Sequence, residues 1–127
     1  KLLLCHGVAD DDLRKVWPGT DRMGIERSHL LDKIILEGEF QYLINGHMHF
    51  RTLIHFEALT LINAGTLRGE HWPGFSVIDF EAENITAFEF RDNQIKRVKT
   101  HDLVQEAHTI WANTQSFCGG WDPVTLF

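Results

Sequence analysis

Apolar residues in the first half of the chain follow the pattern of a strand, a helix and a second strand. Residues 2–5 form a short continuous apolar run, which predicts a strand buried on both faces. Ser28 precedes apolar positions spaced i, i+1, i+4 and i+5, and Gly38 follows them, which predicts an amphipathic helix over 28–37. Residues 41–45, with Tyr42-Leu43-Ile44 at their centre, predict the next strand.

Both predicted strands end at residues that can bind a ligand or act in catalysis. His6-Gly7 follows the first strand, and Gly46-His47-Met48-His49 follows the second. A helix between two strands favours a crossover that makes the strands parallel, so both strands would end at the same edge of one sheet. Ligands gather at that edge in open α/β sheets.

The second half of the chain predicts mainly strands. Turn signals separate five further apolar segments, at 51–56, 59–63, 75–80, 85–90 and 95–99. We expect these strands to form an antiparallel meander after the mixed sheet, within one α/β domain. From Asp102 a helix is predicted, because Leu103, Ala107, Ile110, Trp111 and Thr114 share one face. The aromatic tail, 117–127, either packs on the same domain or contacts a partner.

Three consecutive aspartates precede a short apolar segment. Asp10, Asp11 and Asp12 come before an apolar stretch that stops at Pro18-Gly19. Acidic residues are favourable at the N-terminus of a helix, so the pattern predicts a helix of one or two turns. A metal-binding acidic cluster is the alternative, although adjacent carboxylates at a helix start do not converge on one point.

Composition narrows the class of protein. The chain has 127 residues, 43% of them hydrophobic, and a net charge of −6, which suits one domain with a core. No apolar run approaches the about 20 residues that span a bilayer, and the sequence contains no charged-then-apolar leader pattern with a cleavage site. Basic residues are not clustered, which argues against a surface that wraps nucleic acid. Cys5 and Cys118 lack disulfide or metal-finger spacing, so we expect a cytoplasmic protein.

Eight histidines in so short a chain make a metal site a reasonable hypothesis. His47 and His49 follow a glycine at a strand end, where both rings can turn toward one cleft, and the crossover would bring His6 to the same edge. Neutral imidazoles suit ions of the Zn, Mn or Fe class. On spacing alone, a surface loop or a hydrogen-bonded turn is the commoner outcome for a His-x-His pair.

The other basic side chains are expected to be structural or solvated. The histidines in this group are His29, His55, His71, His101 and His108, of which His71 is the least certain because it lies in the polar and aromatic loop 68–74. Arg51 and Arg68 are candidates for a phosphate contact. A solvated surface position is nevertheless the commoner outcome for an arginine.

Four segments of the chain, taken in order, resemble a known family. Cys5-His6-Gly7, Ile44-Asn45-Gly46-His47-Met48-His49, Leu61-Ile62-Asn63-Ala64-Gly65-Thr66-Leu67 and the strand Phe75-Ser76-Val77-Ile78-Asp79-Phe80 follow one another along the chain. In this order they resemble the C-terminal half of a calcineurin-like metallophosphoesterase. The resemblance covers about residues 1–100, and Gly-His-x-His is its most specific element.

The resemblance implies a metal-dependent phosphoester hydrolase, either a phosphatase or a phosphodiesterase. His6 and His47 would bind one divalent ion and His49 a second, both of the Mn, Fe or Zn class. In this family a hydroxide that bridges two metal ions attacks the phosphorus of a phosphate ester. The fold is a four-layer αββα sandwich. Bound cations would also let an acidic protein attract a phosphate-ester substrate.

The family's upstream motifs, Asp-x-His, Gly-Asp and Gly-Asn-His-Glu, do not occur in this sequence. We therefore expect residues 1–100 to be the C-terminal portion of a metallophosphoesterase domain, with 101–127 packing on it as a helix and aromatic tail. The N-terminal half would be a required partner, and the 127-residue segment alone would be inactive. A non-catalytic scaffold or interaction protein of the same fold is the alternative. The edge beside residues 2–5 would be covered by the missing half or by another copy of the chain.

Overall fold

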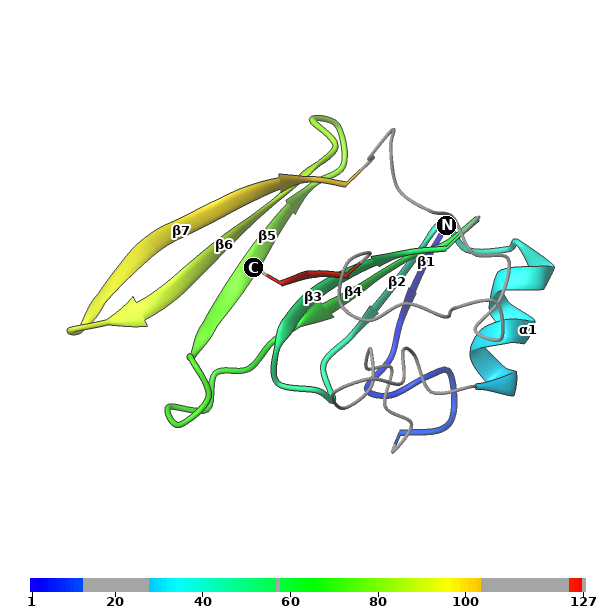
Figure 1. The fold of residues 1–127 in the computed structure, drawn as a ribbon, viewed down its shortest axis with the longest axis horizontal. Helices are drawn as coiled ribbons and strands as arrows, with labels where there is room; N and C mark the ends of the chain where they lie inside the picture. The colour runs from blue at the N-terminus through cyan, green and yellow to red at the C-terminus, as the bar shows by residue number, and fades with distance from the viewer. Residues whose placement is uncertain (13–27, 57, 104–123, 127) are drawn as a thin grey trace.

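The computed structural model describes residues 1–12, 28–56, 58–103 and 124–126 (Figure 1). Within these residues one helix and eight strands form a mixed α/β structure that contains two sheets. The elements are, in order, β1 (Leu2–Leu4), α1 (His29–Glu37), β2 (Tyr42–Asn45), β3 (Arg51–His55), β4 (Thr60–Ala64), β5 (Gly74–Asp79), β6 (Asn84–Arg91), β7 (Gln94–Asp102) and β8 (Val124–Leu126).

The first sheet has five strands in the order β1-β2-β4-β3-β8. β1 and β2 are parallel, with Leu3 opposite Leu43, so the predicted crossover through α1 is confirmed. β2 is also parallel to β4, whereas β3 is antiparallel to both β4 and β8. The sheet is therefore mixed, as expected from the sequence.

The second sheet is a three-stranded antiparallel meander, β5-β6-β7. The prediction of a five-strand meander is therefore wrong for 51–56 and 59–63, because β3 and β4 belong to the mixed sheet. The physical reason is burial. All five residues of β3 are buried, as in a strand covered on both faces, whereas the β7 residues 94–100 are exposed.

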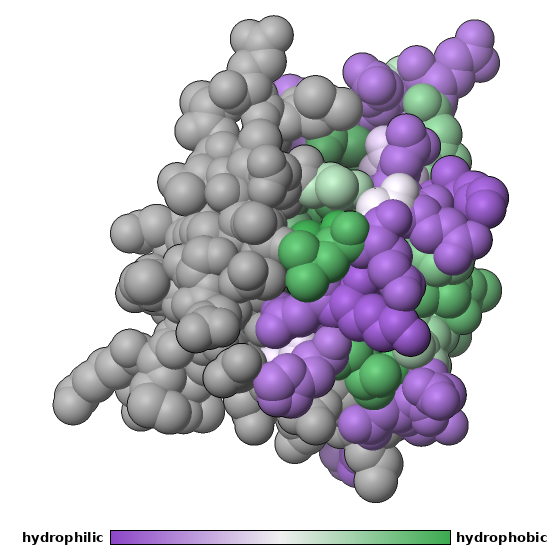
Figure 2. Space-filling view, turned by 90° about the vertical axis from the view of Figure 1, so that its right-hand side faces the viewer, coloured by the Kyte–Doolittle hydropathy of each residue, from purple (hydrophilic) through white to green (hydrophobic). Residues whose placement is uncertain are grey.

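Helix α1 begins and ends as its sequence predicts. The Ser28 side chain accepts a hydrogen bond from the Leu31 N–H, and Gly38 closes the helix in the left-handed conformation at φ 61°. Its polar side lies in solvent, where Lys33 and Glu37 are 3.8 Å apart. Figure 2 shows the side of the molecule that carries α1, where hydrophilic residues predominate among those that are coloured. No helix in the described part of the chain has the length and hydropathy needed to cross a membrane.

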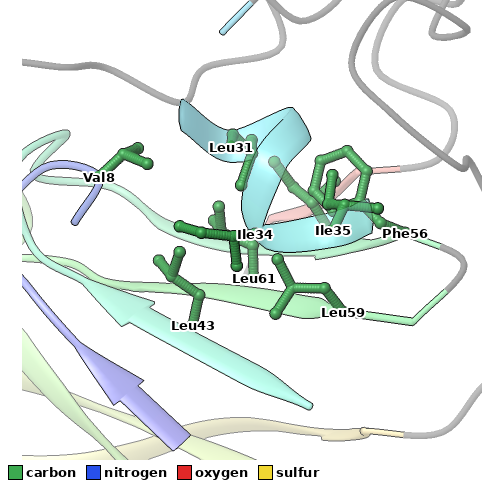
Figure 3. Close-up of a cluster of buried hydrophobic side chains, with 9 residues drawn as sticks. Val8, Leu31, Ile34, Ile35, Leu43, Phe56, Leu59 and Leu61 are labelled. Atoms are coloured by element: carbon green, nitrogen blue, oxygen red, sulfur yellow. The ribbon is translucent and has the colours of Figure 1, made fainter. Parts of the chain in front are cut away.

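Two apolar clusters cover opposite faces of the mixed sheet. One packs α1 against the sheet (Figure 3) and contains Val8, Leu31, Ile34, Ile35, Leu43, Ile54, Phe56, Leu59 and Leu61. The other contains Leu53, Ile62, Ile85 and Leu103, and it packs the antiparallel sheet on the opposite face. Neighbours such as Ile54 and Leu53 fall in different clusters because successive strand residues point to opposite faces. The described residues thus form three layers: helix, mixed sheet and antiparallel sheet.

Strand β1 lies at an edge of the mixed sheet among the described elements. Leu2 and Leu4 are 41% and 72% exposed, so the prediction that this strand is buried on both faces is wrong. A continuous apolar run indicates a strand but does not reveal whether a neighbouring element covers each face. In the described residues, α1 packs against β1 on the Leu3 side alone.

The three aspartates lie in a tight turn, and the short helix predicted to begin with them continues into residues outside those described. Val8 and Asp11 exchange two backbone hydrogen bonds of 3.0 Å each. The segment that follows, 13–27, lies outside the described residues, as does the aromatic tail up to residue 123. The helix predicted to begin at Asp102 also falls there, because β7 extends to Asp102 and only Leu103 beyond it is described.

Candidate functional site

His6 and His47 meet where the parallel strands β1 and β2 end. The carbonyl oxygen of His6 accepts hydrogen bonds of 3.2 Å from the backbone N–H groups of both Gly46 and His47. This fixes the two segments side by side. The His47 Nδ1 and His6 Nε2 atoms lie 3.0 Å apart, and the rings meet edge to face with centroids 5.0 Å apart. The prediction that the crossover brings both strand ends to one edge is confirmed.

A buried amide and a close-packed glycine support this arrangement. Asn45 is buried at the end of β2, and its Nδ2 donates to the Gly7 carbonyl oxygen at 3.1 Å. A Cβ atom on Gly7 would collide with the Asp11 carbonyl oxygen, so glycine is required for the turn after His6. The Asn45 Oδ1 atom is buried and accepts no hydrogen bond from the described residues.

The spacing of the two imidazoles fits a shared metal ion. Two nitrogen ligands about 2.1 Å from one ion are separated by about 3.0–3.4 Å, depending on whether the coordination angle is octahedral or tetrahedral. The observed distance between His6 Nε2 and His47 Nδ1 is 3.0 Å. The same distance also fits a hydrogen bond between the two ring nitrogens, so the two imidazoles can either bond to each other or bind one ion after their rings turn toward it. Among the described residues, no group of three or more His, Cys, Asp or Glu is arranged to hold a metal ion.

His49 contacts a histidine that the sequence had placed among the structural ones. Its ring meets the ring of His71 edge to face, with centroids 5.3 Å apart. His71 lies in the loop between β4 and β5, whereas His49 lies in the loop between β2 and β3. The only signal for this contact in the sequence was the polar and aromatic character of loop 68–74.

A cavity of about 250 Å³ lies beside these two histidines. Its walls come from these two loops, which lie at the same end of the sheets in Figure 1, and from Arg51 on β3 and Glu89 on β6. Phe50 and Trp72 form an aromatic pair in its lining, with ring centroids 6.0 Å apart. The complete lining is His49, Phe50, Arg51, Gly65, His71, Trp72 and Glu89.

Arg51 joins the two sheets through a buried ion pair. Its Nη2 lies 2.6 Å from Glu89 Oε1 on β6, and its Nη1 donates to the Phe88 carbonyl oxygen at 3.3 Å. Arg91 contacts the other oxygen of Glu89, also at 2.6 Å. The expectation of a solvated Arg51 is therefore wrong, because β3 is central and its neighbours supply both a carboxylate and a carbonyl. Arg68, in contrast, is exposed beside Glu70 at 3.0 Å, as expected.

The electrostatic state of Glu89 follows from these contacts. Burial acts to raise the pKa of its carboxyl group, but the hydrogen bonds and charges of Arg51 and Arg91 outweigh this effect and hold the pKa below its usual value. Glu89 is therefore ionised near neutral pH, and its charge is compensated by two guanidinium groups. Because Arg51 is committed to this pair, its charge is not available to attract an anion into the cavity.

The remaining histidines that the structure describes are either solvent-exposed or part of the packing of the fold. His29 is exposed on α1, and His55 is buried with its Nδ1 3.1 Å from Thr60 Oγ1. His101 lies at the end of β7, where burial and the charge of Lys99 lower its pKa despite the opposing charge of Asp102. His108 lies outside the described residues.

The third segment of the resemblance forms a turn beside Arg51. Asn63 is buried, and its Oδ1 accepts a hydrogen bond of 3.2 Å from the Gly65 N–H. Gly65 has a φ of 83°, which glycine adopts without strain. A Cβ there would lie 2.7 Å from Arg51 Cγ, so this glycine also leaves room for the arginine side chain.

No protein-family model matches this sequence, and a search of curated proteins finds no significant match.

Proposed function

We propose that the chain carries metal ligands of a metal-dependent phosphoester hydrolase. His6 and His47 would bind one divalent ion of the Mn, Fe or Zn class, and His49 would bind a second. The observation that supports this most strongly is the 3.0 Å distance between His6 Nε2 and His47 Nδ1 at the ends of two parallel strands. This edge is where ligands bind in α/β sheets.

The layer order is consistent with the proposed fold. A helix on a mixed sheet, with an antiparallel sheet behind it, corresponds to three layers of an αββα sandwich. In the proposal, the fourth layer and the carboxylate ligands belong to an N-terminal half of the domain. Residues 1–100 are then the C-terminal portion, and the 127-residue chain alone does not hydrolyse phosphate esters.

In the proposal, the metal ions and the protein residues have different roles in the reaction. Two divalent ions would supply charge neutralisation at the phosphoryl group and activation of water. The chain's own residues orient the imidazoles: the His6 carbonyl oxygen fixes the backbone of the His47 loop, and Asn45 holds the turn after His6. The net charge of −6 repels a phosphate ester, so binding depends on the cations.

Metal binding by the 127-residue chain tests this proposal directly. Calorimetric titration with Zn²⁺ should show at least tenfold weaker binding for His47→Ala and for His6→Ala than for the wild type. His29→Ala is the matched control, because His29 is an exposed histidine on α1 and its loss should leave binding unchanged. Wild-type affinity in His47→Ala would show that the metal assignment is wrong.

A second candidate function is that of a non-catalytic scaffold with the same fold. The observation that favours it is the exposure of Leu2 and Leu4 along the edge strand β1. Exposed apolar side chains on an edge strand favour pairing with another chain. Absence of phosphoester hydrolysis by the complete protein, with Mn²⁺ supplied, would favour this candidate over a metallohydrolase.

A further inference from the structure

The cavity beside His49 has aromatic walls that the proposed metal chemistry does not use. Trp72 is 69% exposed, although its ring faces Phe50 at a centroid distance of 6.0 Å. A large exposed aromatic side chain in the lining of a cavity is typical of a surface that stacks on a ligand. The cavity therefore offers apolar ring contacts next to two imidazoles.

The backbone is strained on both sides of this cavity. Trp72 has a φ of 48° and His49 a φ of 60°, in the left-handed region that bulky side chains rarely adopt. Such conformations raise the free energy of the folded chain. They cluster at ligand sites, where the surrounding structure enforces them. The other non-glycine residues with positive φ among those described lie in turns outside the lining: Ala9, Glu83, Asp92 and Asn93.

The size and charge of the cavity define the ligand class. Its volume of about 250 Å³ is slightly below the roughly 300–1,000 Å³ of pockets for drug-sized ligands, so it suits one small ring system. The Arg51 guanidinium in the lining is paired with the Glu89 carboxylate, and the second partner of that carboxylate, Arg91, is not among the lining residues. The imidazoles of His49 and His71 can hydrogen-bond to polar atoms on the edge of a ring.

We propose that this cavity binds a planar aromatic group, an aryl ring or a nucleobase, attached to the phosphoryl group of the substrate. The proposal rests on the proposed function, because His49 lines the cavity and would also bind one of the ions. Trp72 and Phe50 contact the ring. The enzyme's substrates are then phosphate esters of aromatic or nucleoside-like compounds, in preference to esters of small alkyl alcohols.

Two phosphonates that cannot be hydrolysed test the proposal in the complete protein, because in the proposal the carboxylate ligands belong to its N-terminal half. With Mn²⁺ present, phenylphosphonate should bind about tenfold more tightly than methylphosphonate, as expected for one ring stacked on an aromatic side chain. Trp72→Ala should abolish this preference, and Trp72→Phe should retain most of it. Leu67→Ala is the matched control, because Leu67 lies in the same loop with the same 69% exposure and does not line the cavity.

A probe without a phosphoryl group separates the two proposals. Added to the metal-free chain, 4-nitrophenol should shift the indole N–H resonance of Trp72, with weaker binding in Trp72→Ala and unchanged binding in Leu67→Ala. If this occurs while neither phosphonate binds with Mn²⁺, the ring site stands and the phosphoesterase assignment fails. If both phosphonates bind equally well, or if Trp72→Ala keeps the preference, the ring site is wrong and the metal assignment stands.

Discussion

The guanidinium of Arg51 and the carboxylate of Glu89 form a 2.6 Å ion pair that connects the two sheets of the fold. Arg51 is on β3 of the mixed sheet and Glu89 is on β6 of the antiparallel sheet. Both side chains are buried, and a second arginine, Arg91, contacts the other oxygen of the Glu89 carboxylate. The pair also lines the cavity beside His49, so sheet packing and site geometry depend on the same contact.

Removal of Arg51 should destabilise the fold strongly. Arg51→Ala leaves a buried carboxylate with only Arg91 as a partner, which should lower the free energy of unfolding by about 3 kcal/mol. Urea denaturation monitored by circular dichroism would measure the change. Arg68→Ala is the matched control, because its exposed pair with Glu70 should contribute less than about 1 kcal/mol. Equal losses in both variants would contradict the assigned role of the buried pair.

The depressed pKa of Glu89 predicts a specific dependence of stability on pH. Between the folded pKa and the higher unfolded pKa, the unfolded chain binds a proton that the folded chain does not. The stabilisation is therefore complete above the usual carboxyl pKa of about 4.3 and is lost as the pH falls through the lower folded value. The free energy of unfolding, measured from pH 7 to pH 3, should fall less steeply in Glu89→Gln than in the wild type. The exposed Glu70→Gln should retain the wild-type slope.

Gly65 should be intolerant of a side chain. Gly65→Ala would place a Cβ 2.7 Å from Arg51 Cγ at a φ of 83°, so we expect a loss of about 1–3 kcal/mol in the free energy of unfolding. Gly69→Ala, in the same loop, is the control, because a Cβ there meets no atom within 4 Å. That change should be neutral, or stabilising by up to about 1 kcal/mol, through the entropy of the unfolded chain. If Gly65→Ala left the free energy of unfolding unchanged, the close contact between Gly65 and the Arg51 side chain would be ruled out.

The N-cap of α1 should contribute measurably to stability. Ser28→Ala removes the oxygen that accepts the Leu31 N–H hydrogen bond of 3.3 Å, which should cost about 1 kcal/mol. Thermal and urea unfolding would both detect a change of this size. Ser28→Thr keeps a hydroxyl in the same position and should recover most of the loss. If threonine were no better than alanine, the stabilisation would come from the packing of Ser28 and not from its hydrogen bond.

Local features of the fold could be predicted because the interactions that define them lie within a few residues. Ser28 and Gly38 mark the ends of α1 through contacts to residues three or four positions away. The strand–helix–strand order also indicated that His6 and His47 end neighbouring strands, because the handedness and parallel pairing of such a unit are nearly invariant.

Partners of the later strands could not be predicted in the same way. The segments 51–56 and 59–63 have apolar patterns like those of a meander, and only their burial within the mixed sheet distinguishes them. The apolar run at 2–5 likewise does not indicate whether it lies at the centre or the edge of a sheet. Pairing between distant strands depends on which surfaces remain to be buried after the local elements form.

The amino-acid sequence by itself determined the helix, the parallel crossover and the meeting of His6 with His47, because each depends on short-range spacing and chain connectivity. Tertiary structure alone decided that His49 meets His71, that Arg51 is buried against Glu89, and that Trp72 and Phe50 face each other in one cavity. These pairs are separated by 22 to 38 residues along the chain. The Arg51–Glu89 contact arises only when the two sheets pack, and the other two arise only when the loops 46–50 and 65–73 come together, which no local pattern encodes.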